Sequence, residues 1–178
     1  MCILAAYDFG ARGQVADIGG GRGHLLDAIT RQHPDVVATL FEQPEVVARV
    51  ATGRGTEDRI QLVAGDFFTD DLPVADVYVL MEIIHDWEDD DAVRILSNIR
   101  RAAPDHAVVL IVETVLREGA GPDPAKTLDI VMLSVTGGRE RTPGDYAALF
   151  ERSGFELAQV IPTIGAVHLV EARPKPAA

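Results

Sequence analysis

One histidine and two glutamates of this sequence stand at places where side chains can do acid–base chemistry. His85 comes shortly after an apolar run, Glu113 closes another, and Glu140 lies in the segment GGRERT. An imidazole can take up a proton near neutral pH, and a carboxylate beside it fixes its tautomer and stabilises the imidazolium. These three side chains are the candidate catalytic groups, with His85 as a general base. The plainer alternatives are a structural histidine and, for Glu140, a helix N-terminal acid.

A glycine-rich loop follows the first apolar run. Residues 15–26 read VADIGGGRGHLL, which predicts a buried strand, a loop and a helix. Gly19 and Gly21 lack a Cβ, so the backbone there can approach a ligand closely. A dinucleotide fingerprint needs a glycine at position 24, which is His24, and the Lys and Ser/Thr of a phosphate-binding loop are absent. S-adenosylmethionine contains an adenosine but no phosphates, so it suits this loop better than NAD or a nucleoside triphosphate does. The alternative is an ordinary tight turn.

Acidic and aromatic side chains near that loop suit a ligand with cationic groups. Asp17 precedes the glycines, and Glu42 closes the next apolar run, where a carboxylate can accept both ribose hydroxyls. Asp66 and Phe67 follow the third run and could hold the adenine; the alternative is a turn-capping aspartate with a core ring. Trp87 is either a ligand-stacking ring or a core anchor. We predict that all five contribute to the cofactor site.

Composition limits the partners and the compartment. The 178 residues suffice for one domain, and 28 acidic against 16 basic residues give a formal charge of -12. This charge disfavours nucleic acid and anionic membranes. A single cysteine, Cys2, and no signal-peptide pattern favour a soluble, cytoplasmic protein. No metal is expected, because the chain has neither paired histidines at helical spacing nor a cysteine cluster.

Alternating apolar and amphipathic stretches predict an α/β fold with a mostly parallel sheet and helices on both faces. The connection between the last two strands is so short that they must form an antiparallel hairpin. The seven expected strands are 14–18, 36–41, 60–64, 77–81, 107–113, 155–161 and 166–172. The expected helices are 23–32, 44–51, 89–102, 124–136 and 143–153.

Six motifs together resemble one enzyme family. In order they are DIGGGRG, LFEQPEV, AGDFF, IIHDW, LDIVMLSVTGGRERT and the closing hairpin. They are similar to the catalytic domain of S-adenosylmethionine-dependent O-methyltransferases of the plant caffeate and flavonoid type and of their bacterial polyketide-tailoring relatives. The resemblance implies a Rossmann-like methyltransferase sheet of seven strands whose last strand is antiparallel, in one catalytic domain over residues 1–178. The family's amino-terminal dimerisation domain is expected to be absent, and the full-length form to be a homodimer through it.

The resemblance also implies roles for individual residues. It implies that Gly19 and Gly21 lie against the methionine and ribose parts of the cofactor, and that Glu42 binds the ribose hydroxyls. Asp66 and Phe67 would hold the adenine. His85 would remove the proton, and Glu113 and Glu140 match the two acids that flank this base in the family. Met132 matches a position that confines the acceptor ring, and Asp86 is expected to contact the acceptor too.

The implied reaction transfers a methyl group to a hydroxyl, expected to be phenolic, of an aromatic or polyketide-type small molecule. S-adenosylhomocysteine is the expected product of the cofactor. Three alternatives remain open: a cofactor-binding domain that is inactive alone, a decarboxylase or hydroxylase of polyketide rings, and, more distantly, a nicotinamide-dependent reductase.

Overall fold

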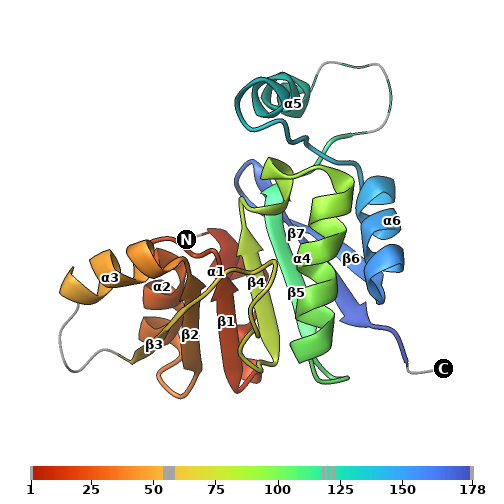
Figure 1. Cartoon of the computed structure of the whole chain (residues 1–178). Coiled ribbons are helices and arrows are strands. Elements are labelled where there is room, and N and C mark those ends of the chain that lie inside the picture. Colours follow the sequence, from red (N-terminus) through yellow and green to blue (C-terminus); the bar gives the residue numbers. More distant parts are fainter. Residues whose placement is uncertain (1, 54–58, 118, 120, 122, 177–178) are drawn as a thin grey trace.

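The computed structural model describes residues 2–53, 59–117, 119, 121 and 123–176, and its centre is one seven-stranded sheet (Figure 1). The strand order is β3-β2-β1-β4-β5-β7-β6. The bounds are β1 (Gln14–Ile18), β2 (Val37–Glu42), β3 (Ile60–Ala64), β4 (Val77–Met81), β5 (Val108–Thr114), β6 (Phe155–Pro162) and β7 (Val167–Pro174). All neighbours pair in parallel except β7, which is antiparallel to both β5 and β6. The predicted fold class and the antiparallel last strand are therefore confirmed.

Helices cover both faces of the sheet. The helices of the described residues are α1 (Cys2–Ala6), α2 (His24–Gln32), α3 (Pro44–Gly53), α4 (Asp89–Ala102), α5 (Pro124–Val135) and α6 (Pro143–Ser153), with 3-10 turns η1 (Phe9–Ala11) and η2 (Ile84–Asp86), and all of the α-helices except α5 pack on the sheet. Residues of α4 and α6 bury their apolar sides in one core, and residues of α1, α2 and α3 in the other. The two cores are separated by the sheet.

Strand β4 shows why the sequence makes a sheet with two covered faces. Its side chains alternate between the faces, so Tyr78 and Leu80 join the core under α4 and α6, while Val77 and Val79 join the opposite core. All four are fully buried. A strand buried on both faces has to be apolar throughout, which explains the continuous runs in the sequence.

Local signals set the helix ends. Thr142 accepts the Asp145 N–H and the Asp145 side chain accepts the Thr142 N–H, so α6 begins with a capping box followed by Pro143. It ends at Ser153, and the capping residue Gly154 has a φ of 83°, which suits glycine. The predicted helix 143–153 is reproduced at both ends. Other predicted helix bounds, and the strand bounds, differ from the observed ones by two residues at most.

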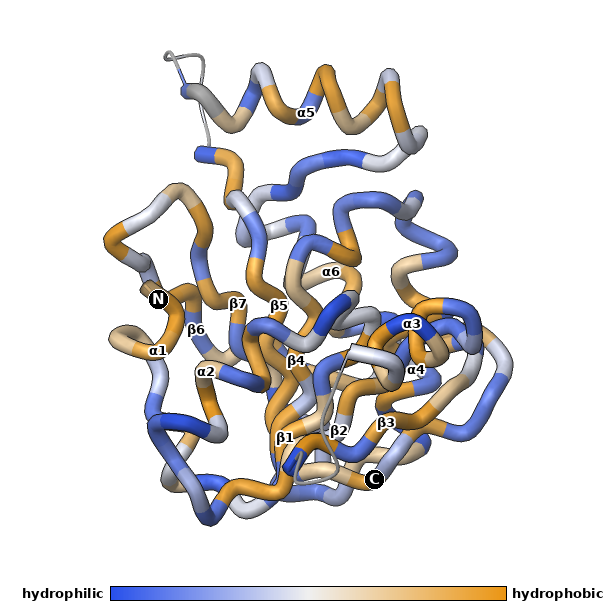
Figure 2. Tube along the Cα trace, turned by 90° about the vertical axis from the view of Figure 1, so that its left-hand side faces the viewer, coloured by the Kyte–Doolittle hydropathy of each residue, from blue (hydrophilic) through white to orange (hydrophobic). Residues whose placement is uncertain are grey.

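Helix α5 stands away from the sheet, above the carboxyl ends of its strands (Figure 1). Figure 2 shows apolar residues along it, and Ile130, Leu133 and Val135 are 66%, 67% and 74% exposed. Within the described ranges, no helix is long and apolar enough to cross a membrane.

Candidate active site

His85 lies in the turn η2 just beyond the carboxyl end of β4. The chain reaches this turn through Glu82, whose φ of 56° is in the left-handed region that non-glycine residues seldom adopt. Such backbone costs about 1–3 kcal/mol and persists where the surroundings impose it. Here the N–H of Glu82 is held by the carbonyl oxygen of Val112 at 3.1 Å. The result is a histidine at the sheet edge where open α/β folds bind their ligands.

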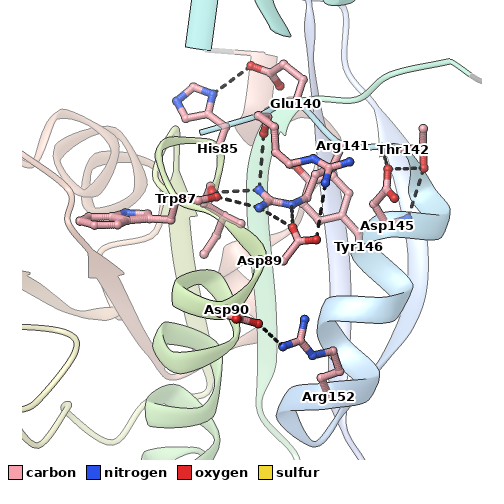
Figure 3. Close-up of polar contacts among 12 residues, drawn as sticks. His85, Trp87, Asp89, Asp90, Glu140, Arg141, Thr142, Asp145, Tyr146 and Arg152 are labelled. Carbon is pink, nitrogen blue, oxygen red and sulfur yellow. Dashed lines mark hydrogen bonds and ion pairs between the residues drawn. The ribbon is translucent and has the colours of Figure 1, made fainter. Parts of the chain in front are cut away.

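The imidazole of His85 is bound on one side by Glu140 (Figure 3). Its Nδ1 lies 3.0 Å from Glu140 Oε1, and the Glu140 side chain is fully buried. Because a carboxylate only accepts hydrogen bonds, Nδ1 carries the proton and Nε2 remains the basic nitrogen. Burial lowers the pKa of His85, but the Glu140 hydrogen bond and the Glu113 charge outweigh burial and raise the pKa above 6.5. The ring is therefore a stronger base than a free histidine.

Glu113 reaches the same turn but binds its main chain instead of its ring. One carboxylate oxygen accepts the N–H of His85 at 3.0 Å, and the other accepts the hydroxyl of Tyr146 at 2.5 Å. The sequence led us to expect that Glu113 orients the imidazole, so its observed contact differs. Burial raises the pKa of Glu113, and the Tyr146 bond partly offsets this rise.

Tyr146 is a site residue that sequence reasoning missed. It is fully buried in α6, and its hydroxyl is bound to a carboxylate from another element. The sequence analysis placed it only within the expected helix 143–153, and its spacing from Glu113 carried no signal.

The glycine-rich segment before α6 also contacts the turn η2, through its main chain. The N–H of Arg139 donates to the carbonyl oxygen of His85 at 2.8 Å. Gly138 permits this approach, because a Cβ there would lie 1.9 Å from the same oxygen. The N–H of Glu140 donates to Asp129 Oδ1 of α5 at 2.8 Å. The main chain that carries the ring and the main chain that carries its carboxylate are thus tied together.

A cleft of about 430 Å³ opens at the carboxyl ends of β1, β2 and β3. Its lining residues are Gly19, Glu42, Gln43, Val46, Gly65, Asp66, Phe67, Phe68, Ile83 and Trp87. At Gly19 the φ of 73° favours glycine, and a Cβ would lie 2.7 Å from Ile83 Cδ1, so that side chain would have to move. Five of the residues predicted for cofactor binding line this one cleft.

Asp17 lies beneath the glycine loop with both carboxylate oxygens unpaired. The side chain is fully buried, and within the described part of the chain neither oxygen has a hydrogen-bond partner. A Cβ on Gly20 would lie 2.2 Å from its Oδ2, so the carboxylate is directly under the loop. Burial, together with the nearby Glu42 charge, raises the pKa of Asp17 from 3.8 to about 7. A buried, unpaired carboxylate lowers the stability of the fold when no ligand is bound, and a cationic ligand would compensate its charge.

A second cleft of about 510 Å³ lies between the start of α4 and the end of α5. It is lined by Asp86, Trp87, Glu88, Asp91, Thr136 and Gly137. Asp86 Oδ1 is 3.8 Å from His85 Nε2, which puts the basic nitrogen next to this cleft. Trp87 lines both clefts, and its ring packs edge-on against Phe67 and Phe68 at 6.0 and 4.8 Å between centroids. The indole therefore fits both alternatives: it faces the clefts and packs against neighbouring rings.

Three other predicted residues have weaker ties to the site. At Gly21 a Cβ would meet no atom within 4 Å, although its φ of 58° favours glycine. Asp66 Oδ1 accepts the N–H of Phe68 at 2.8 Å, so this residue caps its own turn while also lining the cleft. Met132 is half-buried on α5 and lines neither of the two clefts.

Comparison with known proteins gives consistent matches over this whole region. Residues 1–156 match the family model described as the O-methyltransferase domain. The phenazine O-methyltransferase PhzM of Lysobacter antibioticus is 46% identical over 176 residues, 97% of this chain and 51% of that protein. The mitomycin biosynthesis 6-O-methyltransferase of Streptomyces lavendulae is 39% identical over 177 residues, 96% of this chain and 50% of that protein.

A solved structure is similar as well. It is an O-methyltransferase from neocarzinostatin biosynthesis in complex with S-adenosylmethionine and 2-hydroxy-5-methyl naphthoic acid. The TM-score is 0.84 at 37% identity, over 97% of this chain and 52% of that chain. The chain therefore spans about half the length of the relatives that it matches.

Proposed function

This chain belongs to the family of O-methyltransferase domains, and we propose that its site moves the methyl group of S-adenosylmethionine to a hydroxyl oxygen of a small aromatic molecule. The resemblance seen in the sequence is confirmed at the level of the family. The observation that carries the proposal is the bond between His85 Nδ1 and Glu140, which leaves Nε2 as a base beside the second cleft.

The residues of the first cleft fit the cofactor. Glu42 at the end of β2 would accept the ribose hydroxyls, and Asp66 with Phe67 would hold the adenine. The unpaired carboxylate of Asp17 under the loop attracts the cationic end of the ligand. The solved relative from neocarzinostatin biosynthesis binds S-adenosylmethionine. When bound, this cofactor supplies an electrophilic methyl group on a sulfonium sulfur.

The proton of the acceptor goes to His85 Nε2. A phenol, with a pKa of about 10, is mostly protonated at neutral pH and so needs a base. Glu140 stabilises the resulting imidazolium through Nδ1, and Asp86 lies 3.8 Å from Nε2. General-base help contributes about 10²- to 10⁴-fold, and alignment of the reacting atoms by the two clefts contributes more. A phenolic acceptor is supported by the hydroxylated naphthoic acid bound in the solved relative.

Calorimetry and product mass test this proposal together. We expect S-adenosylmethionine and S-adenosylhomocysteine to bind and NADH not to bind, with a product heavier than the acceptor by one methylene. His85→Gln should lower turnover about 10²- to 10⁴-fold while cofactor affinity stays unchanged. Equal losses of turnover and cofactor affinity would contradict the role of His85 as a base. A product that has lost carboxyl or gained oxygen would instead indicate decarboxylation or hydroxylation.

A second candidate is a cofactor-binding unit that is inactive without the rest of a longer protein. It is favoured by the exposed apolar side of α5, where Ile130, Leu133 and Val135 face no described neighbour closely enough to be buried. In this case a further domain would cover α5, complete the acceptor wall and join two copies into a homodimer. Turnover that appears only when the other half of a longer protein is added would support this candidate; full turnover by this chain alone would contradict it.

A further inference from the structure

We infer that Arg141 is a positioning residue for the proton-accepting histidine: its guanidinium holds the main chain on both sides of His85 and so keeps the ring on Glu140. The inference rests on the proposed role of His85. It concerns a side chain that reaches no reacting atom and acts only through the turn η2.

The contacts of Arg141 enclose the turn. The side chain is fully buried. Its Nη1 donates to the carbonyl oxygen of Ile84 at 2.9 Å, and its Nη2 donates to the carbonyl oxygen of Trp87 at 2.7 Å (Figure 3). These two carbonyls flank His85 and Asp86 in the chain. One guanidinium therefore spans the short turn on which the imidazole stands.

The same guanidinium anchors the turn to α4. Its Nε and Nη2 lie 3.1 and 2.9 Å from Asp89 Oδ1 in the first turn of that helix. Asp89 compensates the buried positive charge, which would be strongly unfavourable if it were left unpaired. The turn and the helix that follows it are thus fixed to each other through Arg141.

Two consecutive side chains of one segment bind different parts of the turn η2. Glu140 and Arg141 are consecutive, and the segment pairs with the end of β5 through a bridge between Val115 and Arg141. In extended chain consecutive side chains point to opposite sides. Glu140 thus binds the ring of His85, while Arg141 binds the main chain around it. A shift of the turn away from Arg141 would stretch the ring's bond to Glu140.

Lysine cannot replace this arginine. A guanidinium offers five donors in a fixed plane, whereas an ammonium offers three donors on one atom. Two carbonyls and one carboxylate on separate residues need the planar arrangement. Arg141→Lys keeps the charge and most of the apolar stem, so it tests the arrangement of the donors.

The test is the pKa of His85, measured by NMR on the chain with labelled histidine. His85→Gln identifies the signal, because that variant lacks it. In Arg141→Lys we expect the pKa of His85 to fall, since burial would then outweigh a weakened Glu140 bond. Turnover should fall roughly 10-fold or more. The matched control is Arg152→Lys, which alters an exposed pair between α6 and α4, Arg152 to Asp90 at 2.6 Å, and should leave the pKa unchanged.

An unchanged pKa of His85 in folded Arg141→Lys would overturn the inference. If that variant does not fold, Asp89→Asn is the second test, because it weakens the contact that fixes Arg141 to α4. We expect the pKa of His85 to fall in this variant too. An unchanged pKa of His85 in Asp89→Asn would overturn the inference. The proposed function fails separately, through undiminished turnover of His85→Gln. If His85→Gln loses turnover and the pKa of His85 does not change in Arg141→Lys, His85 remains the base and only the positioning role of Arg141 is contradicted.

Discussion

The buried carboxylate of Asp17 makes the free energy of unfolding depend on pH in a defined direction. Folding raises its pKa from 3.8 to about 7, or about 3 units, and one unit corresponds to about 1.4 kcal/mol. The folded protein therefore binds more protons than the unfolded chain between these two values. Stability that is fully present below the lower pKa is lost as the pH rises through the upper one. Above that pH the ionised group costs the folded state about 4 kcal/mol.

Asp17→Asn isolates this effect, because asparagine has the same shape without the charge. We expect the variant and the original chain to be similar in stability at about pH 4, and the variant to be more stable by up to about 4 kcal/mol at about pH 8. Urea unfolding at both pH values, with the slope compared as well as the midpoint, measures the difference.

Asp76→Asn is the matched control with the opposite sign. Burial raises the pKa of Asp76, but hydrogen bonds from His106 and from the main chain of Gln14 and Gly13 outweigh burial and lower it. Asparagine should therefore destabilise the protein at pH values above the unfolded pKa of the carboxyl, and this loss should disappear as the pH falls through the lowered folded value.

Asp17→Asn should also weaken binding of S-adenosylmethionine, since it removes the charge that we assign to the cationic end of the ligand. The reasoning is refuted if the variant is less stable than the original chain at about pH 8, or if its gain is the same at both pH values. Unchanged cofactor affinity would contradict the ligand role alone.

Two further substitutions test the contacts around the turn η2. Gly138→Ala should lower stability by more than about 2 kcal/mol and reduce turnover, because its Cβ would lie 1.9 Å from a main-chain oxygen of the turn, whereas Gly144→Ala has room and should be nearly neutral. Tyr146→Phe removes the hydroxyl bound to Glu113 at 2.5 Å and should cost roughly 1.5–3 kcal/mol. Because that bond lowers the pKa of Glu113, the loss should be larger above the carboxyl's titration range than below it. Tyr78→Phe is the control: the Tyr78 hydroxyl binds main-chain groups, so its removal should lower the free energy of unfolding equally above and below that pH range.

Urea unfolding and turnover assays check both substitutions. A fully stable and active Gly138→Ala would show that the segment does not approach the turn as closely as described. A loss in Tyr146→Phe that does not change with pH would show that Glu113 is not ionised there.

The sequence alone determined the layers of this protein and the edge of the sheet at which its candidate site lies. Short continuous apolar runs bounded by turn residues indicate strands buried on both faces, and the short last connection requires an antiparallel hairpin. Helix ends were readable where the signal is local, as at Pro143. The glycine loop and the residues that follow each strand were readable too, because the ends of parallel strands meet at one edge. Gly19, Glu42, Asp66, Phe67 and Trp87, which the sequence placed together at that edge, line one cleft, and their binding of a cofactor stays a prediction.

The tertiary structure decided which atoms meet within that site. Glu113 and Tyr146 are 33 positions apart, and Arg141 lies 57 positions from the carbonyl of Ile84 that it binds. Local periodicity reaches only a few residues, so it cannot show such pairs. The acceptors of Arg141 include main-chain carbonyls, which every residue carries, so no residue type marks them in advance.

The turn η2 was likewise decided by packing. Nothing in its residues favours a 3-10 turn or the positive φ of Glu82. Glu113, Arg139 and Arg141 bind the main chain of the turn, and the carbonyl oxygen of Val112 accepts the N–H of Glu82. The sequence named the histidine and its acidic partner, and only the folded chain could fix the backbone that points one at the other, since that backbone is held by groups far away in the sequence.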